Sequence, residues 1–290
     1  MIEGVNLIKF PKQTKYSSSH RLREMVLVLR KHNVLTSDMT PEKLRLILED
    51  LGPTFVKLGQ ILSLKPGFLP ADYAIELTKL QTQAKPLDFS IIKNCLEKEY
   101  NKKLEDVFLD IDDHALGSAS IAQVHKATLK TGEKIVIKVQ RPGIYEVMAK
   151  DIVLLKRAVS ILQVFKTSSS ILDFNAILDE MWNITKQEMD FMMEAEHIDE
   201  FKRLNSEDIF VDCPTVKHEL TTARVLVMEY IDGHRIDEIS KLKAQGYNVE
   251  ELGIHLGKNY VKQIIEDGYF HADPHPGNIW IKNGKIIWLD

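Results

Sequence analysis

Three things are scarce in this sequence: cysteine, an excess of charge of either sign, and long apolar runs. Cys95 and Cys213 are the only cysteines among 290 residues, and neither has a Cys or His at zinc-finger spacing, which argues against a disulfide framework and a structural zinc site. The 38 basic and 42 acidic side chains give a formal charge of −4, so nothing signals a nucleic-acid partner. No apolar run approaches the roughly 18 residues that span a bilayer, and the first residues lack a signal-peptide core. We therefore expect a cytoplasmic globular protein without a membrane span.

The hydrophobic pattern predicts helices over about residues 20–105. Thr40 is placed to cap a helix that begins at Pro41, carries apolar residues on one face and closes at Gly52. A second helix restarts at Pro53. Further helices are expected over about 71–83 and 89–103.

From Val107 the pattern is typical of β-strands. The stretch 107–140 predicts three antiparallel strands, with a tight turn at Thr131-Gly132. Beyond it, the expected elements are helices over about 142–205, a buried strand over 223–233, a helix over 249–267 and a strand pair that turns at Asn283-Gly284. The mixture predicts an α+β fold.

The densest cluster of chemically active residues is HADPHPGN, residues 271–278. Three interpretations compete: a metal site on His271, Asp273 and His275, a hydrolase, or a phosphoryl-transfer loop in which Asp273 and Asn278 are the working pair. The rest of the chain has to decide among them.

Lys138 lies in the middle of the strand IVIKVQ. Alternation places Val136, Lys138 and Gln140 on one face of the strand, so the lysine has polar company, and a solvent-facing lysine is the simplest explanation. Upstream, GSASIAQVH (117–125) supplies a run of small residues that lets backbone N–H groups approach a phosphate closely. A small-residue turn, a lysine on the third strand and then an acidic helix resemble the nucleotide-binding lobe of protein kinases.

That resemblance gives the 271–278 cluster a meaning. Kinase catalytic loops separate a base aspartate from a metal-binding asparagine by five positions, which is the spacing of Asp273 and Asn278. A second metal-binding aspartate is expected on a strand end soon afterwards, where Asp290 stands. Magnesium prefers oxygen ligands, which Asn278 and Asp290 supply, so the phosphoryl-transfer interpretation is favoured over the zinc site.

Five motifs in order resemble the UbiB (AarF/UbiB-type) family of atypical protein-kinase-like proteins. They cover about residues 40–290: Lys57-x-Gly59-Gln60 in LGPTFVKLGQILS, GSASIAQVH, VIKVQRPG, Glu188-x-Asp190 in QEMDFMMEA, and HADPHPGN. The resemblance implies a kinase-like fold with a helical N-terminal extension over the active site. Lys57 and Gln60 would then meet Glu188 and Asp190 where a protein substrate otherwise binds, and these four residues would be regulatory.

The roles expected from the resemblance follow kinase chemistry. Asp273 is the expected base, and Lys138 is expected to hold the α and β phosphates while Glu194 fixes it. ATP and Mg²⁺ are the expected cofactors, with Asn278 and Asp290 as metal ligands. The expected nucleotide contacts come from the small-residue turn and from the hinge, and their residues are Gly117, Ser118, Ala119, Ser120, Lys138, Glu229 and Ile231.

Three segments are expected: a helical extension over 1–105, a kinase-like N-lobe with inserted helices over 106–232, and a partial C-lobe over 233–290. The chain is expected to stop before most of the C-lobe helices. The resemblance implies an ATP-dependent phosphotransferase or ATPase linked to isoprenoid quinone biosynthesis or membrane lipid homeostasis, with a lipid- or quinone-like ligand and peripheral contact with a membrane. The alternative is a non-catalytic nucleotide- or lipid-binding scaffold, or an inactive gene fragment.

Overall fold

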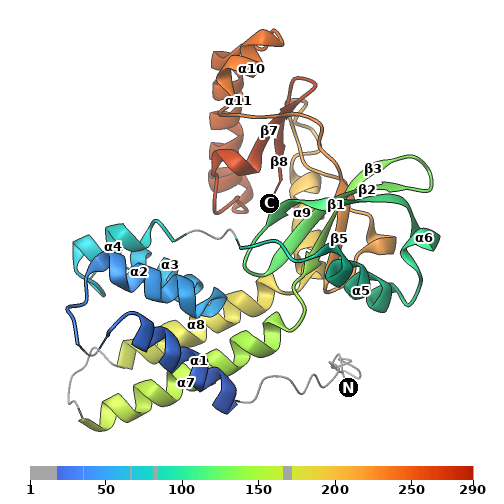
Figure 1. Cartoon of the computed structure of the whole chain (residues 1–290). Helices are drawn as coiled ribbons and strands as arrows, with labels where there is room; N and C mark the ends of the chain where they lie inside the picture. The colour runs from blue at the N-terminus through green and yellow to red at the C-terminus, as the bar shows by residue number, and fades with distance from the viewer. Residues whose placement is uncertain (1–17, 35, 66, 81–83, 166–171, 290) are drawn as a thin grey trace, which may run out of the picture. The chain divides into compact units, whose positions relative to one another are not determined.

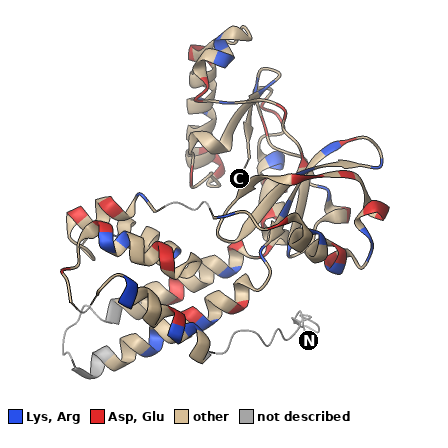
Figure 2. Cartoon of the chain, viewed as in Figure 1, with Lys and Arg blue, Asp and Glu red and all other residues tan. Residues whose placement is uncertain are grey.

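A computed structural model describes residues 18–34, 36–65, 67–80, 84–165 and 172–289. The chain forms two compact units: residues 1–83 with 141–186, and residues 84–140 with 187–290 (Figure 1). Lysines, arginines and acidic residues are interspersed in both units (Figure 2), which agrees with the near balance of charge in the sequence.

The first unit is helical, and its cap residues are those that the sequence predicted. Thr40 caps α2 by accepting a hydrogen bond from the Lys43 amide, Pro41 is the first helical residue, and Gly52 ends the helix at a φ of 96°. The helices of this unit are α1 (Ser18–Lys31), α2 (Pro41–Leu51), α3 (Pro53–Leu64), α4 (Ala71–Leu77), α7 (Ile144–Phe165) and most of α8 (Leu172–Glu188).

A buried ion pair joins three helices of the first unit. Asp151 of α7 is fully buried and accepts two hydrogen bonds from Arg21 of α1, at 2.7 and 2.9 Å, and one from the Thr54 hydroxyl of α3 at 2.7 Å. Burial alone would lower the pKa of Arg21, but the hydrogen bonds to Asp151 raise it above its ordinary value. Both carboxylate oxygens of Asp151 therefore accept hydrogen bonds from other helices, and Arg21 supplies the counter-charge.

The second unit is built on an antiparallel sheet with the strand order β1-β2-β3-β5. The three antiparallel strands and the buried strand near residue 226 are thus confirmed. Their bounds are β1 Phe108–Ser118, β2 Ala122–Leu129, β3 Lys134–Gln140 and β5 Val225–Glu229.

The two faces of this sheet carry different helices. Ile135, Ile137 and Val139 of β3 pack with α5 (Phe89–Tyr100) and α6 (Leu104–Val107). The opposite face carries Lys138 and packs against α9 (Phe191–Leu204) through Leu226 of β5. The predicted alternation along β3 is therefore what directs Lys138 toward a helix and not into the apolar layer.

The remainder of the second unit holds the 271–278 loop. A small sheet with the order β4-β8-β7-β6 combines β4 (Val211–Asp212), β6 (His234–Arg235), β7 (Ile279–Lys282) and β8 (Lys285–Trp288). The β7–β8 turn uses Asn283 at φ 52° and Gly284 at φ 78°, as the Asn-Gly pair predicted. Two helices, α10 (Ile239–Ala244) and α11 (Val249–Lys262), pack beside it, and α11 continues into a π-helical turn over Gln263–Asp267.

The compact units do not follow the boundary that the sequence pattern suggested near residue 105. The second unit begins at Ala84, because α5 and α6 bury Ile92, Leu96 and Leu104 against the sheet. The inserted helices α7 and most of α8 join the first unit, whose cores include Ile152. None of the helices in the described part of the chain is both long and apolar enough to cross a bilayer.

Candidate nucleotide and phosphoryl-transfer site

Lys138 and Glu194 form the central contact of the site. The Lys138 Nζ atom donates to both carboxylate oxygens of Glu194, at 2.8 and 2.9 Å, and each side chain is about one-fifth exposed. The ring of Phe191 lies under the ammonium group at 5.3 Å. The structure thus brings together the lysine and the glutamate that the sequence paired.

The start of α9 is fixed by local hydrogen bonds, and these set the position of Glu194. Asp190 caps the helix by accepting from the Met192 amide, and Phe191 donates its amide to the Ala223 carbonyl before β5. Gln140, at the end of β3, donates to the Met189 carbonyl at 2.9 Å. The C-terminal end of β3, which carries Lys138, is therefore hydrogen-bonded to the segment that begins α9, which carries Glu194.

The small-residue turn lies between β1 and β2. Ala119 donates its amide to the Ala122 carbonyl at 2.8 Å, which closes the turn, and Ser118 donates its hydroxyl to Gln123. Gly117 and Ala119 are exposed, and Ser120 is half-buried. Because these side chains are small, the backbone of the turn is open to a bulky anion.

The predicted hinge follows β5. The amides of Glu229 and Tyr230 are used inside the protein, by the carbonyls of Thr215 and Lys134. The Ile231 amide has no acceptor among the residues that the structure describes. The Glu229 side chain is paired with Lys282 at 2.7 Å, so any contact of Glu229 with an adenine has to come from its backbone.

The 271–278 loop is held by its own side chains and amides. Asp273 donates its amide to His271 Nδ1 at 3.1 Å, and Gly277 donates its amide to His275 Nδ1 at 3.0 Å. Asn278 donates from Nδ2 to the Asp273 carbonyl at 3.3 Å. Asp273 itself is exposed, which is what contact with a substrate hydroxyl or water requires.

These contacts bear on which metal the loop can hold. A histidine Nδ1 that accepts an amide hydrogen cannot ligate zinc with the same atom, and both His271 and His275 are used in this way. Asn278 spends its Nδ2 group on the loop, which leaves the Oδ1 oxygen as the atom that can coordinate a cation. The donor set fits magnesium better than zinc. The predicted partner ligand Asp290 lies outside the described residues.

The four predicted regulatory residues are divided between the two units. Lys57 and Gln60 lie on α3, and Gln60 donates to the Leu80 carbonyl at 3.1 Å. Glu188 and Asp190 belong to the second unit, where Asp190 is the cap of α9. Contact between Lys57 and the acidic pair stays a prediction.

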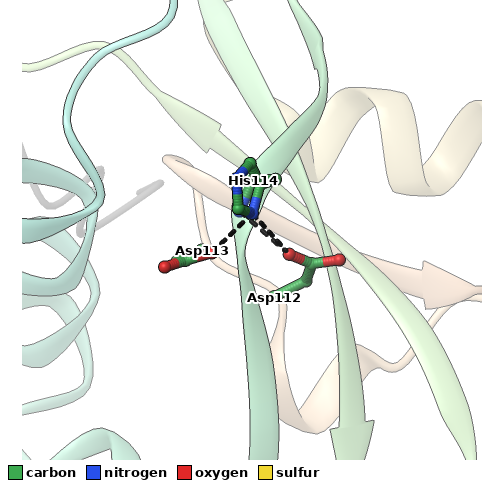
Figure 3. Close-up of side chains that lie close together, drawn as sticks. All are labelled: Asp112, Asp113 and His114. Atoms are coloured by element: carbon green, nitrogen blue, oxygen red, sulfur yellow. Dashed lines mark hydrogen bonds and ion pairs between the residues drawn. The ribbon is translucent and has the colours of Figure 1, made fainter.

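A second group of potential metal ligands was not suggested by the sequence. Asp112, Asp113 and His114 bring ligand atoms within 4.8 Å of one another at an irregular part of β1 (Figure 3). His114 is 92% exposed and pairs with Asp113 at 2.7 Å and Asp112 at 3.5 Å. Those exposed ion pairs account for the closeness of the three side chains, so we assign no metal to them.

Two residues of the GSASIAQVH motif have structural roles that sequence reasoning missed. Gln123 is buried and holds Leu87 at both its amide and its carbonyl, at 2.8 and 3.2 Å. Its Nε2 also donates to His125 Nε2, so His125 is the tautomer that donates from Nδ1 to the Asp112 carbonyl. Period-two alternation places both residues on one face of β2, and that is the signal that could have found the pair.

Three features define a protein-kinase-like fold: the antiparallel sheet, the Lys138–Glu194 pair on the face that packs against α9, and the loop that follows α11. Residues 79–290 match the ABC1 atypical kinase-like domain, and the chain belongs to that family.

Relatives of known sequence agree. The chain is 33% identical to a probable protein kinase UbiB from Shewanella, over 99% of this chain and 53% of that protein. It is 36% identical to ACTIVITY OF BC1 COMPLEX KINASE 8, a chloroplastic protein of Arabidopsis thaliana, over 95% of this chain and 36% of the relative. It is 42% identical to an uncharacterized Clostridium pasteurianum protein from the hydrogenase 1 5' region, over 94% and 53%. The resemblance to UbiB is thus confirmed.

A solved structure shares the fold. The Mycobacterium tuberculosis protein Rv3197, determined with erythromycin, superposes with a TM-score of 0.60 at 26% identity, covering 94% of this chain and 66% of its own. The chain spans about half the length of the UbiB and Clostridium relatives, and less of the chloroplastic one.

Proposed function

We propose that the chain binds Mg-ATP and supports transfer of the γ-phosphoryl group to an acceptor or to water. The observation that carries the proposal is the contact of Lys138 with both carboxylate oxygens of Glu194, on the face of the sheet that packs against α9. A lysine held in this way presents a fixed positive charge to the α and β phosphates. Two relatives, the Shewanella UbiB protein and the chloroplastic Arabidopsis protein, carry the word kinase in their names, which supports the same class of chemistry.

In this proposal the remaining residues divide the work. The turn at Gly117, Ser118, Ala119 and Ser120 covers the phosphates, and the Ile231 amide with the Glu229 carbonyl receives the adenine edge. Asn278 and Asp290 would hold the magnesium ion, which neutralises phosphate charge when it is bound. Asp273 orients the attacking hydroxyl or water and takes its proton.

Two substitutions test the proposal. Lys138→Ala should weaken Mg-ATP binding by roughly 1 kcal/mol or more, the scale of a lost charge-assisted hydrogen bond. Asp273→Asn should leave binding near that of the parent and reduce turnover by about 10² to 10⁴. Calorimetry with Mg-ATP and a phosphate-release assay provide the two measurements. Parent protein that binds no Mg-ATP would refute the proposal, and binding without turnover in parent and variant alike would favour the scaffold alternative.

We also propose that Lys57 occludes the phosphoryl-acceptor side of the site by pairing with Glu188 or Asp190, as the family resemblance implies. Lys57→Ala should then change the preference between nucleotides or permit autophosphorylation. Lys79→Ala is the matched control, because Lys79 lies in the same unit, is 61% exposed and pairs with Glu76. If both variants behave like the parent, Lys57 has no regulatory part.

The acceptor that we propose is a small lipid- or quinone-like molecule at a membrane surface. The support is the resemblance to UbiB proteins, and the measurement is ATP turnover with and without vesicles that contain an isoprenoid quinone analogue. Stimulation by the quinone vesicles and not by plain vesicles would support a quinone acceptor. Equal turnover in all three conditions would remove it.

A further inference from the structure

Three buried amide side chains form a continuous hydrogen-bonded chain in the second unit. Asn205, Asn259 and Gln263 are 5%, 2% and 0% exposed. Gln263 Nε2 donates to Asn259 Oδ1 at 2.7 Å, and Asn259 Nδ2 donates to Asn205 Oδ1 at 2.7 Å. The three come from α9's end, from α11 and from the π-helical turn, so the contacts join separate elements.

The two ends of this chain are backbone groups. At one end the His271 amide donates to Gln263 Oε1 at 3.0 Å. At the other end Asn205 Nδ2 donates to the Phe201 carbonyl of α9 at 2.9 Å. An N–H at one end and a C=O at the other determine the orientation of all three amides, because reversing them would set donor against donor at His271 and oxygen against oxygen at Phe201.

The hydrogen-bonded chain of amides therefore has a direction, and an ionised carboxylate cannot replace any of its members. Each member must accept on one side and donate on the other, which a carboxylate cannot do. Aligned amides polarise one another, and each buried group depends on its neighbours for satisfaction. Asp208 adds a second acceptor for Asn259 Nδ2 at 3.4 Å.

The ends of the chain are functionally placed. Phe201 and Asn205 terminate the helix that carries Glu194. His271 begins the 271–278 loop, and its Nδ1 receives the amide of Asp273. A path of consecutive hydrogen bonds thus runs from the helix of the lysine-binding glutamate to the backbone of the candidate base.

The local fold around Gln263 supports this reach. The polypeptide leaves α11 through the π-helical turn and Gly268, which has a φ of 62°. Tyr269 then donates its amide back to the Gln263 carbonyl at 3.1 Å. That reversal brings His271 beside a side chain eight residues earlier. Lys262 reinforces the junction by bonding the Leu204 carbonyl at 3.0 Å and Asp267 at 2.7 Å. π-Helical turns within helices are often associated with functional sites.

We propose that Asn205, Asn259 and Gln263 are positioning residues that hold Asp273 in register with the Lys138–Glu194 pair. None of the three touches the proposed nucleotide, and each acts through its neighbour. We call this hydrogen-bonded chain of Asn205, Asn259 and Gln263 the relay. Its effect on turnover rests on the proposed function, whereas its effect on the rigidity of the 271–278 loop does not.

Hydrogen exchange tests the mechanical part without a ligand. Asn259→Leu removes the middle amide, which does not contact the loop, and Asn205→Ala removes the far one. In both variants the His271 amide should exchange roughly five- to tenfold faster than in the parent, the effect of losing about one hydrogen bond. Leu252→Ala is the control, because Leu252 is a buried apolar residue on the same helix as Asn259 but outside the relay. In this variant the His271 amide should exchange as in the parent. Parent-like exchange at His271 in both amide variants, or equal acceleration in the control, would overturn the relay.

Turnover tests the catalytic part. Relative to the parent, Asn259→Leu should lower ATP turnover about tenfold while the Kd for Mg-ATP changes less than about twofold, since the Lys138 contact is untouched. A loss of affinity equal to the loss of turnover would assign the relay to general stability. A parent that does not bind or turn over ATP would remove the proposed function, while the exchange result would still decide the relay.

Discussion

Lys138 on β3 donates to both carboxylate oxygens of Glu194 on α9, at 2.8 and 2.9 Å, across a sequence separation of 56 residues. Neither side chain is more than about one-fifth exposed, so water screens the pair only partly. Because the two distances differ by only 0.1 Å, the ammonium group lies almost midway between the two carboxylate oxygens. In the proposed function, this geometry holds the lysine as a stationary positive charge for the phosphates.

Glu194→Gln should therefore weaken Mg-ATP binding about tenfold. Glutamine keeps the size of the side chain but removes its charge, so Lys138 loses the partner that holds it, at a cost of about 1.4 kcal/mol. Isothermal calorimetry measures the change. Glu200→Gln is the matched control, because Glu200 pairs with Arg203 on the exposed side of the same helix and should have no effect on binding. If Glu194→Gln leaves the Kd for Mg-ATP unchanged, the ion pair does not contribute to nucleotide binding.

Periodicity and turn chemistry were sufficient to predict most of the second unit's sheet from sequence. The hairpin at Asn283-Gly284 and the cap at Thr40 depend on residues adjacent in the chain, and both formed as expected. Lys138 was placed on the correct face because strand alternation is a local property. The pairing of Lys138 with Glu194 was predicted from the order of the motifs along the whole chain. No short stretch of the sequence would have indicated it.

Long-range packing could not be read in the same way. Asp151 looks like one more acidic residue on a helix, and nothing near it in sequence announces that Arg21 and Thr54 enclose it. The amides Asn259 and Gln263 likewise lie on a helix whose pattern is consistent with a solvated polar face. Their burial follows from tertiary contacts, which is also why α5 was assigned to the helical extension rather than to the sheet that covers it.

Asp151→Asn should destabilise the first unit by about 3 kcal/mol. The substitution removes the buried counter-charge of the largely buried Arg21 guanidinium and, among the residues that the structure describes, leaves it only Glu24, whose side chain is 40% exposed. Removing one partner of a buried ion pair is strongly destabilising. Urea unfolding followed by circular dichroism measures the loss. Glu180→Gln, which breaks the exposed pair with Lys65 in the same unit, should change stability by less than about 0.5 kcal/mol. Equal effects of the two substitutions would contradict the structural importance of Asp151.

The two cysteines should differ in reactivity. Burial raises the pKa of the Cys213 thiol to about 12, and its Sγ contacts the Ile198 carbonyl at 3.6 Å. Burial also raises the pKa of Cys95, which remains partly exposed. Iodoacetamide at pH 8 should therefore label Cys95 and leave Cys213 unlabelled until urea unfolds the protein, as peptide mass spectrometry would show. Prompt labelling of Cys213 in the folded protein would contradict its burial.

The same thiol gives a pH dependence with a defined sign. The folded pKa of Cys213 lies above 9.0, the value for an unburied thiol, so its contribution to stability is complete below about pH 9. That contribution is lost as the pH rises from 9 toward 12, because the unfolded chain releases the proton first. Cys213→Ala should flatten the alkaline fall in unfolding free energy between these limits, and Cys95→Ala should flatten it less.

Gly59 has a physical reason to be glycine that is separate from any regulatory role of its motif. A Cβ atom at this position would lie 2.4 Å from Leu80 Cδ1 and 2.7 Å from Leu48 Cδ1, and both leucines are buried. The backbone of Leu80 is further constrained, because its carbonyl accepts from Gln60. Neither leucine can move away without disturbing the core that holds α2, α3 and α4 together.

Gly59→Ala should consequently lower the unfolding free energy by about 1 kcal/mol. Overpacking costs roughly 1–3 kcal/mol, and the higher helix propensity of alanine offsets up to about 1 kcal/mol of that cost. Gly253→Ala on α11 is the matched control, because a Cβ there meets nothing within 4 Å and only the propensity gain remains. Thermal or urea unfolding should therefore shift in opposite directions for the two glycines. Stabilisation by both substitutions would show that Leu48 and Leu80 make room at little cost, and that close packing is not what requires glycine at position 59.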